Sequence, residues 1–474
     1  MDGSDWRPGD PAPPPVRNPN LYPNYADDVD EPPAWPDAVG PCGRKMLIAA
    51  IAGSTTWDEV LKIKKETGFA LEEVEIARIE MGYREEYLKR FDASLIFANG
   101  TRLTYMLAFG NSETANRRCT WLLGPDGVIA SQESTTFDAS LLEGLRIGLG
   151  VKTRASTRLP LPRRGNEDCD FPEESEADSR TPEQLGGARD ALKYVADAMI
   201  PGLVATELEK LSLTTVARLL VLPDSDIASY PFAALPFQKG HLVDRFDIII
   251  LPSIKVMLTP RTTTKLPTKL KEQEALIVGE PDLSADKAAC WRELPHAKIE
   301  AGYAAQQFGI KKSLLGKTAT FKQVRDRLRA NRKTLKLIYF ATHGIADQEN
   351  PADESYLALR GQYLRGADLR KLQFGGSPLV VLSACQSGLG KVFPGGLFGL
   401  AQAWRYAGAD RVVISLWNVS DMGTEALMKI FVDGLTAADL EPEVALSRAM
   451  RTLKQSQPDP AIWAAFAYYG TPAN

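Results

Sequence analysis

From about Thr181 to its end, the chain alternates short apolar runs with longer stretches of helical periodicity. The apolar runs, rich in Val, Ile and Leu, are ARLLVLP, FDIIILP, EALIVGE, LKLIYFAT, PLVVLSA and RVVISLW. Stretches such as HAKIEAGYAAQQF, ATFKQVRDRLRAN and DMGTEALMKIFVDGL separate several of these runs and have the spacing of amphipathic helices. Strands that are apolar on both faces are typical of parallel sheets with helices on each side. We therefore predict an α/β fold with a mostly parallel sheet covered on both faces.

The first third of the chain has a different character. With 474 residues, the protein is long enough for two or three domains. Residues 1–44 hold 11 of the 32 prolines and show little periodicity, which predicts an extended or disordered segment. Residues 45–150 mix helical stretches with two hairpin signals, one at Asn99-Gly100 and one around Pro125-Asp126-Gly127. This stretch is predicted to form a small α+β domain that precedes the main sheet.

A charged segment separates the two parts. Residues 151–180 are first basic and then acidic, with few apolar positions, so we predict an exposed linker. The α/β domain then occupies residues 181–474. It opens with a long helical stretch, EQLGGARDALKYVADAMIPGLVATEL, that we expect to break at Pro201.

Composition limits the class of protein. The chain has 56 basic and 60 acidic residues and a net charge of −4, so no contact with nucleic acid is expected. No apolar run reaches the roughly eighteen residues of a membrane span, and the polar, proline-rich N-terminus is no signal peptide. The five cysteines are scattered and include no CxxC pair, so neither a metal site nor a disulfide framework is expected. A reducing, cytoplasmic location follows as a prediction.

Two apolar runs end on side chains that can do chemistry. LKLIYFATHGIAD ends on His343-Gly344, and VVLSACQSGLG ends on Cys385, 42 residues later. Neighbouring parallel strands would bring both to one edge of the sheet, which is where ligands of such folds bind. There the imidazole can take the thiol proton or hold the thiolate as an ion pair. The backbone N–H groups of Gly344 and Cys385 are candidate donors to a developing oxyanion.

Simpler readings compete with a catalytic pair. A lone cysteine at a strand end is usually a small buried hydrophobe. The protein can also be a non-catalytic adaptor that keeps the fold for binding. A different α/β hydrolase or a nucleotide sensor is a further alternative, although the chain has no G-x-S-x-G elbow and GEPDLSADK is not a phosphate loop.

The same segments resemble a known family. FATHG, VVLSACQSGLG and AGADRVVISLWNVSD are similar to the CHAT-domain family of caspase-like cysteine peptidases, distant relatives of separase. Upstream, RLLVLPDSDIASYPFAALPFQKGHLVDRFDIIILPS, ALIVGEPDL and ELPHAKIEA resemble the family's earlier strands and helix, and EVALSRAMRTL and PAIWAAFAYYG resemble its end. The resemblance covers roughly residues 185–471. It implies a caspase-like fold and cleavage of protein substrates without a cofactor, with Cys385 as nucleophile and His343 as base.

The resemblance has two departures. The tetratricopeptide repeats that often precede this domain are absent from the sequence, so residues 45–150 serve sensing, substrate docking or extension of the sheet. No long linker like the one cut in many caspases follows Cys385, because Pro394-Gly395-Gly396 and a helical stretch come within about ten residues. Regulation is therefore expected from residues 1–180 or from a protein partner.

The corner around the nucleophile predicts a substrate pocket. Ser383 and Ala384 are small and leave room for the residue before the cut bond, and Trp417 forms a wall or only packs in the core. Residues 416–419 can pair with an extended substrate by β-addition. Asp421 can select a basic residue, but the N-cap of the helix MGTEALMKIF is the simpler reading. We therefore expect a medium apolar or unbranched residue before the cut, with a basic one as the alternative.

The other chemistry-bearing residues have simpler expected roles. His241 lies at a turn before a strand, and His296 is expected to be exposed in the first turn of a helix. Glu300, one turn later, is expected to pair with Lys298 or solvent. Cys119 and Cys290 are predicted to be packing residues, and Cys42 and Cys169 lie in segments of low order.

Overall fold

The computed structural model describes the α/β region and part of what precedes it. The described residues are 42, 50, 104–111, 117–124, 127–134, 182–211, 216–223, 230–252, 265–285, 291, 293–345, 353–384, 399–417 and 421–472. Expectations for residues 1–41, for the Asn99-Gly100 hairpin and for the 151–180 linker lie outside them. So does Cys385.

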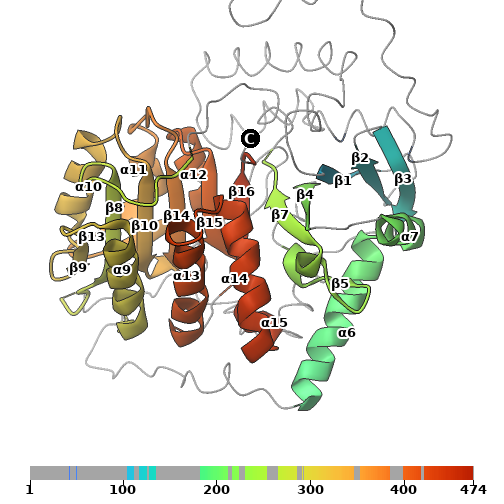
Figure 1. Ribbon diagram of the computed structural model, residues 1–474. Helices are drawn as coiled ribbons and strands as arrows, with labels where there is room; N and C mark the ends of the chain where they lie inside the picture. The colour runs from blue at the N-terminus through green and yellow to red at the C-terminus, as the bar shows by residue number, and fades with distance from the viewer. Residues whose placement is uncertain are drawn as a thin grey trace, which may run out of the picture.

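One sheet of eleven strands dominates the structure, with the order β3-β2-β1-β4-β7-β16-β15-β14-β10-β8-β9 (Figure 1). The strands are β1 Thr104–Asn111, β2 Arg118–Gly124, β3 Gly127–Ser134, β4 Ala217–Leu222, β7 Phe246–Ile250, β8 Ala275–Pro281, β9 Leu314–Gly316, β10 Leu337–Thr342, β14 Leu379–Ala384, β15 Arg411–Ser415 and β16 Phe466–Gly470. All six apolar runs of the sequence became strands of this sheet. The predicted α/β fold with a mostly parallel sheet is confirmed.

The sheet consists of two parallel blocks that run in opposite directions. Strands β1, β4, β7 and β16 are parallel to one another, and we call them the β7 block. Strands β15, β14, β10, β8 and β9 are also parallel to one another and form the β10 block. The blocks meet where β15 pairs antiparallel with β16. The carboxyl ends of the two blocks therefore lie at opposite edges of the sheet.

Helices cover both faces of the β10 block. The helices are α6 Pro182–Met199, α7 Gly202–Lys210, α9 Pro295–Phe308, α10 Phe321–Ala330, α11 Gly366–Leu369, α12 Gly399–Tyr406, α13 Asp421–Thr436, α14 Pro442–Ser456 and α15 Pro460–Trp463. Tyr339 of β10 reaches Glu300 of α9, whereas its neighbour Phe340 packs on Trp404 of α12 with ring centroids 5.9 Å apart. Since successive strand residues point to opposite faces, α9 and α12 lie on opposite sides of the sheet. Helices α9, α13 and α14 lie side by side on the first face (Figure 1).

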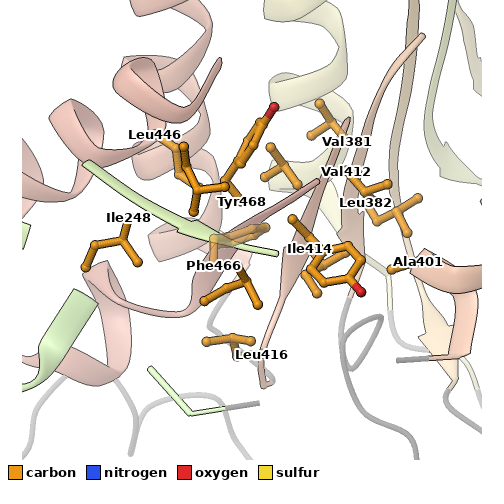
Figure 2. Packing of buried hydrophobic residues seen from close by; sticks show 14 of the residues in the cluster. Ile248, Val381, Leu382, Ala401, Val412, Ile414, Leu416, Leu446, Phe466 and Tyr468 are labelled. Carbon is orange, nitrogen blue, oxygen red and sulfur yellow. The ribbon is translucent and has the colours of Figure 1, made fainter. Parts of the chain in front are cut away.

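Apolar packing fixes β14 relative to its neighbours. Figure 2 shows Val381 of β14, Val412 and Ile414 of β15, and Tyr468 of β16 in one continuous cluster, each at most 1% exposed. Each fully buried side chain of this size contributes about 1.5–3 kcal/mol through the removal of apolar surface from water. The carboxyl end of β14, where Cys385 follows, is thus carried on a tightly packed strand.

The described part of residues 45–150 extends the main sheet. Strands β2 and β3 pair antiparallel up to Gly124 and Gly127, which confirms the second predicted hairpin. Strand β1 pairs with β2 on one side and runs parallel to β4 on the other. Sheet extension was one of the three roles that the sequence left open for this stretch. The break of the opening helix at Pro201 is also present, between α6 and α7.

One expectation about the cysteines is wrong. Cys42 and Cys119 form a disulfide between residues 77 positions apart. The fold brings Cys42 next to Cys119 of β2. There the indole N–H of Trp121, also on β2, donates to the Cys42 carbonyl over 2.9 Å. No short motif marks a pair at such a separation, so cysteine spacing gave no sign of it. Disulfides persist mainly in oxidising surroundings, so the cysteines no longer support a reducing compartment, and a cytoplasmic location is left as a prediction.

Candidate active site

Strands β10 and β14 end level with each other in the middle of the β10 block (Figure 1). Their register pairs Leu337 with Leu379 and, at the other end, Thr342 with Ala384. The next residue along the chain is His343 on one strand and Cys385 on the other. Both predicted strand ends therefore come to one edge of the sheet. Cys385 itself lies outside the described residues, so its side chain is not part of this geometry.

His343 is half-buried and its ring rests against an aromatic neighbour. The centroids of the His343 and Trp291 rings are 5.0 Å apart with an angle of 36° between their planes. On the other side of the backbone, the His343 carbonyl accepts a hydrogen bond from the N–H of Ala358 over 2.9 Å. The hydroxyl of Thr342 donates to the Ala358 carbonyl over 2.8 Å. The strand end that carries the imidazole is thus held from two directions.

Gly344 begins a small sheet of its own. The sheet consists of β11 Gly344–Ile345, β12 Tyr356–Leu359 and β13 Gln362–Arg365. Gly344 faces Leu357 across an antiparallel pair, and the bond from Ala358 to His343 flanks that pair. In this pattern the facing residues exchange no hydrogen bonds, so the Gly344 N–H points away from β12. That direction makes its N–H a candidate donor to a ligand at the strand end.

The last described residue of β14 is held from the neighbouring strand. The hydroxyl of Ser415, on β15, donates to the Ala384 carbonyl over 2.5 Å. Ser415 and Ala384 are 2% and 3% exposed, so water does not compete for this bond. The bond fixes the orientation of the peptide group that joins Ala384 to Cys385. Sequence reasoning missed Ser415, and its strand position carries no motif that would have identified it.

A carboxyl group lies buried beneath the same strand ends. Glu300 of α9 is 2% exposed and accepts a hydrogen bond from the Tyr339 hydroxyl over 2.6 Å. The hydroxyl of Ser383 makes a looser contact with Glu300, short of hydrogen-bond geometry. Burial raises the pKa of Glu300 to about 8, against the opposing effect of the Tyr339 and Ser383 hydroxyls. Glu300 therefore carries a proton at neutral pH.

The expectation for Glu300 is wrong. It pairs with neither Lys298 nor solvent, and the Lys298 ammonium lies 3.8 Å from Glu280 instead. The helical pattern contained the signal, because Glu300 shares its face of α9 with the apolar residues Ala297, Ala301 and Ala304. A carboxyl on the buried face of a helix is uncommon and marks a candidate for function or strain.

Asp421 connects two helices. It is the first residue of α13, and its carboxylate accepts from the backbone N–H groups of His296 over 2.8 Å and of Ala297 over 3.0 Å. These donors belong to the first turn of α9, so Asp421 caps the start of a neighbouring helix. The sequence had assigned it to a cap, but of the helix that Asp421 itself begins. Capping accounts for the burial of this carboxylate, which is 9% exposed.

His296 and Trp417 are also held by specific contacts. The Nδ1 atom of His296 hydrogen-bonds to Glu425, so His296 is not the freely exposed residue that was expected. Burial raises the pKa of Glu425, but hydrogen bonds from Lys429 and His296 outweigh it and hold that pKa below its usual value. Trp417 is 3% exposed, and its indole donates to the Ala461 carbonyl over 2.8 Å. A role for Trp417 as a pocket wall stays a prediction.

His241 lies away from the strand ends of the β10 block. It sits on the short strand β6 Gly240–His241, next to the turn η5 Leu242–Asp244, as the sequence indicated. Burial and the nearby Lys454 ammonium lower its pKa to about 4, against the opposing charge of Asp244. Of the three histidines, His343 alone follows a strand of the β10 block.

Two further features are absent from the described residues. These residues contain no group of side chains that could bind a metal ion. None of the helices described there has the length and hydropathy of a membrane-spanning segment.

The sheet with its two edge-aligned strand ends defines a caspase-like fold. The model of the CHAT domain family matches residues 189–471, more than half of the chain, and the protein therefore belongs to that family. This confirms the resemblance carried by the sequence motifs. The structure of the Saccharomyces cerevisiae separase–securin complex is similar, with a TM-score of 0.50 and 12% sequence identity over 87% of this chain and 33% of that chain.

Two relatives found by sequence are much longer than this chain. Tetratricopeptide repeat protein 28 of Mus musculus is 24% identical over 306 residues, and its Homo sapiens counterpart is 24% identical over 302 residues. Each match covers 54% of this chain and 12% of the relative. The chain thus corresponds to a small part of these proteins.

Proposed function

We propose that the protein is a cysteine endopeptidase in which Cys385 is the nucleophile and His343 is the base. The observation that carries the proposal is the register of β10 on β14, in which Thr342 faces Ala384. Because adjacent strands lie about 4.8 Å apart, residues that follow such a pair start within reach of a hydrogen bond between side chains. Family membership supports the same two residues, since the motifs FATHG and VVLSACQSGLG contain them.

The proposed reaction follows from these groups. The His343 imidazole takes the proton of the Cys385 thiol, and the sulfur attacks the carbonyl carbon of the substrate peptide bond. The tetrahedral intermediate expels the amine, which receives the proton from His343, and an acyl-enzyme remains. Water then gives a proton to His343 and attacks the thioester carbonyl. The carboxylic acid product leaves, and the Cys385 thiolate takes the proton back from His343. No cofactor takes part in these steps.

The oxyanion donors are proposed to be the N–H groups of Gly344 and Cys385. A trans peptide places its N–H opposite its carbonyl. The Ala384 carbonyl accepts from Ser415 on β15, so we expect the N–H that follows it to be directed to the β10 side. The Gly344 N–H, which points away from β12, supports a second donor on that side. Two fixed donors of this kind typically contribute a factor of about 10²–10³ each to turnover.

We propose a pocket near Ser383, Ala384, Trp417 and Asp421 for the residue before the cut. A medium apolar or unbranched side chain is expected there, because both carboxylate oxygens of Asp421 already accept backbone N–H groups of α9. If Asp421 selected arginine instead, the requirement for arginine would disappear in Asp421→Asn. An unchanged melting temperature in that variant would separate this outcome from loss of the α9 cap.

Regulation by a second protein is part of the proposal. The similar separase structure is a complex with securin. We propose that activity here is controlled by a protein partner or by residues 1–180, and that the protein acts on protein substrates in the cytoplasm.

The experiment that tests the function is a cleavage profile. The purified full chain is incubated with a proteome-derived peptide library, and new ends are identified by mass spectrometry. We expect a defined set of cuts that disappears in Cys385→Ala and persists in Cys290→Ala. An adaptor would give the same profile for the wild type and Cys385→Ala.

A further inference from the structure

A groove opens on the side of His343 that lies away from β14. It has a volume of about 720 Å³ and runs between the end of β8, the start of α10 and the β12–β13 hairpin. Its lining includes Asp282, Phe321, Leu359, Gln362, Tyr363 and Asp368. The groove is separate from the pocket proposed for the residue before the cut, which lies on the β14–β15 side.

Aromatic rings connect this groove to His343. Trp291 lies between the two, with its ring centroid 5.0 Å from that of His343 and 6.1 Å from that of Tyr363. Tyr363 in turn stacks on Tyr356, with centroids 4.5 Å apart and planes inclined by 15°. Tyr356 is 3% exposed, so the Tyr363 ring is backed by the protein interior. The Trp291 and Tyr363 rings therefore form an aromatic surface that runs from the His343 imidazole to the groove and packs on Tyr356.

The order of the strands gives a peptide substrate its direction. From the pocket side, the strands are β15, β14, β10 and β8. Given the proposed function, the nucleophile follows β14, and His343 after β10 donates its proton to the leaving amine. The amine, and the part of the substrate attached to it, therefore lie over β10 and continue toward β8. That path leads to the groove.

We propose that this groove binds the part of the substrate that follows the cut bond, with its third residue against Tyr363. The inference rests on the proposed peptidase function. An extended peptide advances about 3.3 Å per residue. The two ring-to-ring steps of 5.0 Å and 6.1 Å set an upper limit on the distance from His343 to Tyr363, which at most about three residues cover.

The Tyr363 ring favours a cationic side chain at that position. Charges of both signs line the groove. The Asp368 carboxylate accepts the backbone N–H of Arg365 over 3.0 Å, and the Arg365 guanidinium is bonded to Glu354 over 3.0 Å. Hydrogen bonds from Ser284 lower the pKa of Asp282, and its other oxygen is 3.9 Å from Arg360. An arginine side chain can stack on the Tyr363 ring, whereas a carboxylate gains nothing from the face of that ring. We therefore expect arginine to be preferred over glutamate as the third residue after the cut.

Peptides that differ only after the cut test the proposal. They share a cleaved sequence from the library and end either one or four residues beyond the cut, with arginine third. We expect kcat/KM to be about tenfold higher for the longer peptide, from the typical strength of one cation–π contact. Tyr363→Ala should remove this gain and leave the short peptide unaffected. The control Tyr194→Ala, at a tyrosine on α6 that is 65% exposed, should change neither value.

Direct binding separates this proposal from the peptidase function. The tetrapeptide amides Ala-Ala-Arg-Ala and Ala-Ala-Glu-Ala, with free amino termini, are titrated into Cys385→Ala by calorimetry. We expect the arginine peptide to bind about tenfold more tightly, and the difference to vanish when Tyr363→Ala is added. If the wild type cleaves nothing but this difference is present, the peptidase function fails and the groove stands. Equal binding of both tetrapeptides, or equal kcat/KM for short and long substrates, would overturn the groove proposal.

Discussion

The two blocks of the sheet bury carboxyl groups in different ways. In the β7 block, Glu443 of α14 is fully buried and lies 3.4 Å from the guanidinium of Arg218 on β4. Asp247 on β7 is equally buried and lies 3.0 Å from the guanidinium of Arg451, also on α14. Each of these two acids faces a cation. Helix α14 is therefore attached to two strands by paired charges.

In the β10 block, the comparable buried acid is held by a hydroxyl group. Glu300 of α9 accepts from Tyr339 of β10, and the nearby charged side chains of Asp421 and Glu425 are acidic, which adds to the rise in its pKa. Glu300 keeps its proton, whereas Glu443 and Asp247 of the β7 block each have a guanidinium partner. Buried ion pairs commonly serve structure, whereas a strongly shifted pKa beneath two strand ends is more typical of a functional site. The comparison shows that the β7 block pairs its buried acids with cations, whereas the β10 block holds a protonated acid beneath the strand ends where the site is proposed.

Removing a cation from the β7 block should have the largest effect on stability. Arg218→Met leaves Glu443 without this partner in a fully buried position, and we expect a loss of about 3–5 kcal/mol in the free energy of unfolding. Urea denaturation at pH 7 measures it. The matched control is Arg117→Met, at an arginine that is 57% exposed and 2.8 Å from Glu133, where the loss should stay below about 1 kcal/mol. Equal losses in the two variants would remove the basis for the comparison.

A neutral substitute for Glu300 should have a smaller, pH-dependent effect. The folded-state carboxyl holds its proton up to about pH 8, whereas the ordinary value is 4.5. Between these values the folded state binds more protons than the unfolded state, so wild-type stability falls as pH rises. Glu300→Gln lacks this loss. The free energy of unfolding of the variant minus that of the wild type should therefore rise by about 2–4 kcal/mol from pH 5 to pH 8.

The control for this pH dependence is an exposed acid. Glu354→Gln, at a side chain that is 46% exposed, should follow the wild type at both pH values. A difference between Glu300→Gln and the wild type that does not change with pH would show that Glu300 is ionised in the folded protein. In that case the contrast between the blocks would be wrong.

Loss of one hydroxyl at the strand end should have the smallest effect on stability, about 1 kcal/mol, together with an effect on turnover. Ser415→Ala frees the Ala384 carbonyl, and we expect kcat to fall by about tenfold, the value of one net hydrogen bond. Thr120→Val removes a similar bond, from the Thr120 hydroxyl to the Met199 carbonyl over 2.9 Å, far along the sheet. It should lower stability by a similar amount without changing kcat. Equal effects of both variants on kcat would mean that Ser415 acts only through stability.

The fold of residues 181–474 was largely readable because its strands are apolar on both faces. Runs such as LKLIYFAT cannot be exposed on either side, and only a helix-covered sheet buries them. The sequence did not reveal that β16 reverses direction, because strand orientation depends on tertiary pairing and leaves no mark in FAYYG. The short strands of the β12–β13 hairpin were missed for a similar reason, since four residues carry too little periodicity.

The candidate site was predictable where it depends on strand ends and not where it depends on packing across elements. The level ends of β10 and β14 follow from parallel pairing alone. The contact from Glu300 to Tyr339 and the Asp421 cap of α9 join segments 39 and more than 100 residues apart, so no local pattern encodes them. The Cys42–Cys119 disulfide belongs to the same class.

The central claim is that His343 and Cys385 act as one unit. The most direct test compares the cleavage of one library-derived substrate by the wild type, Cys385→Ala, His343→Ala and the double variant, with melting temperatures measured for all four. Each single variant should lose at least about 10³-fold in kcat/KM, and the double variant should be little worse, because residues that act together have non-additive effects. The melting temperatures should agree within a few degrees. Near-normal turnover by His343→Ala would contradict the account.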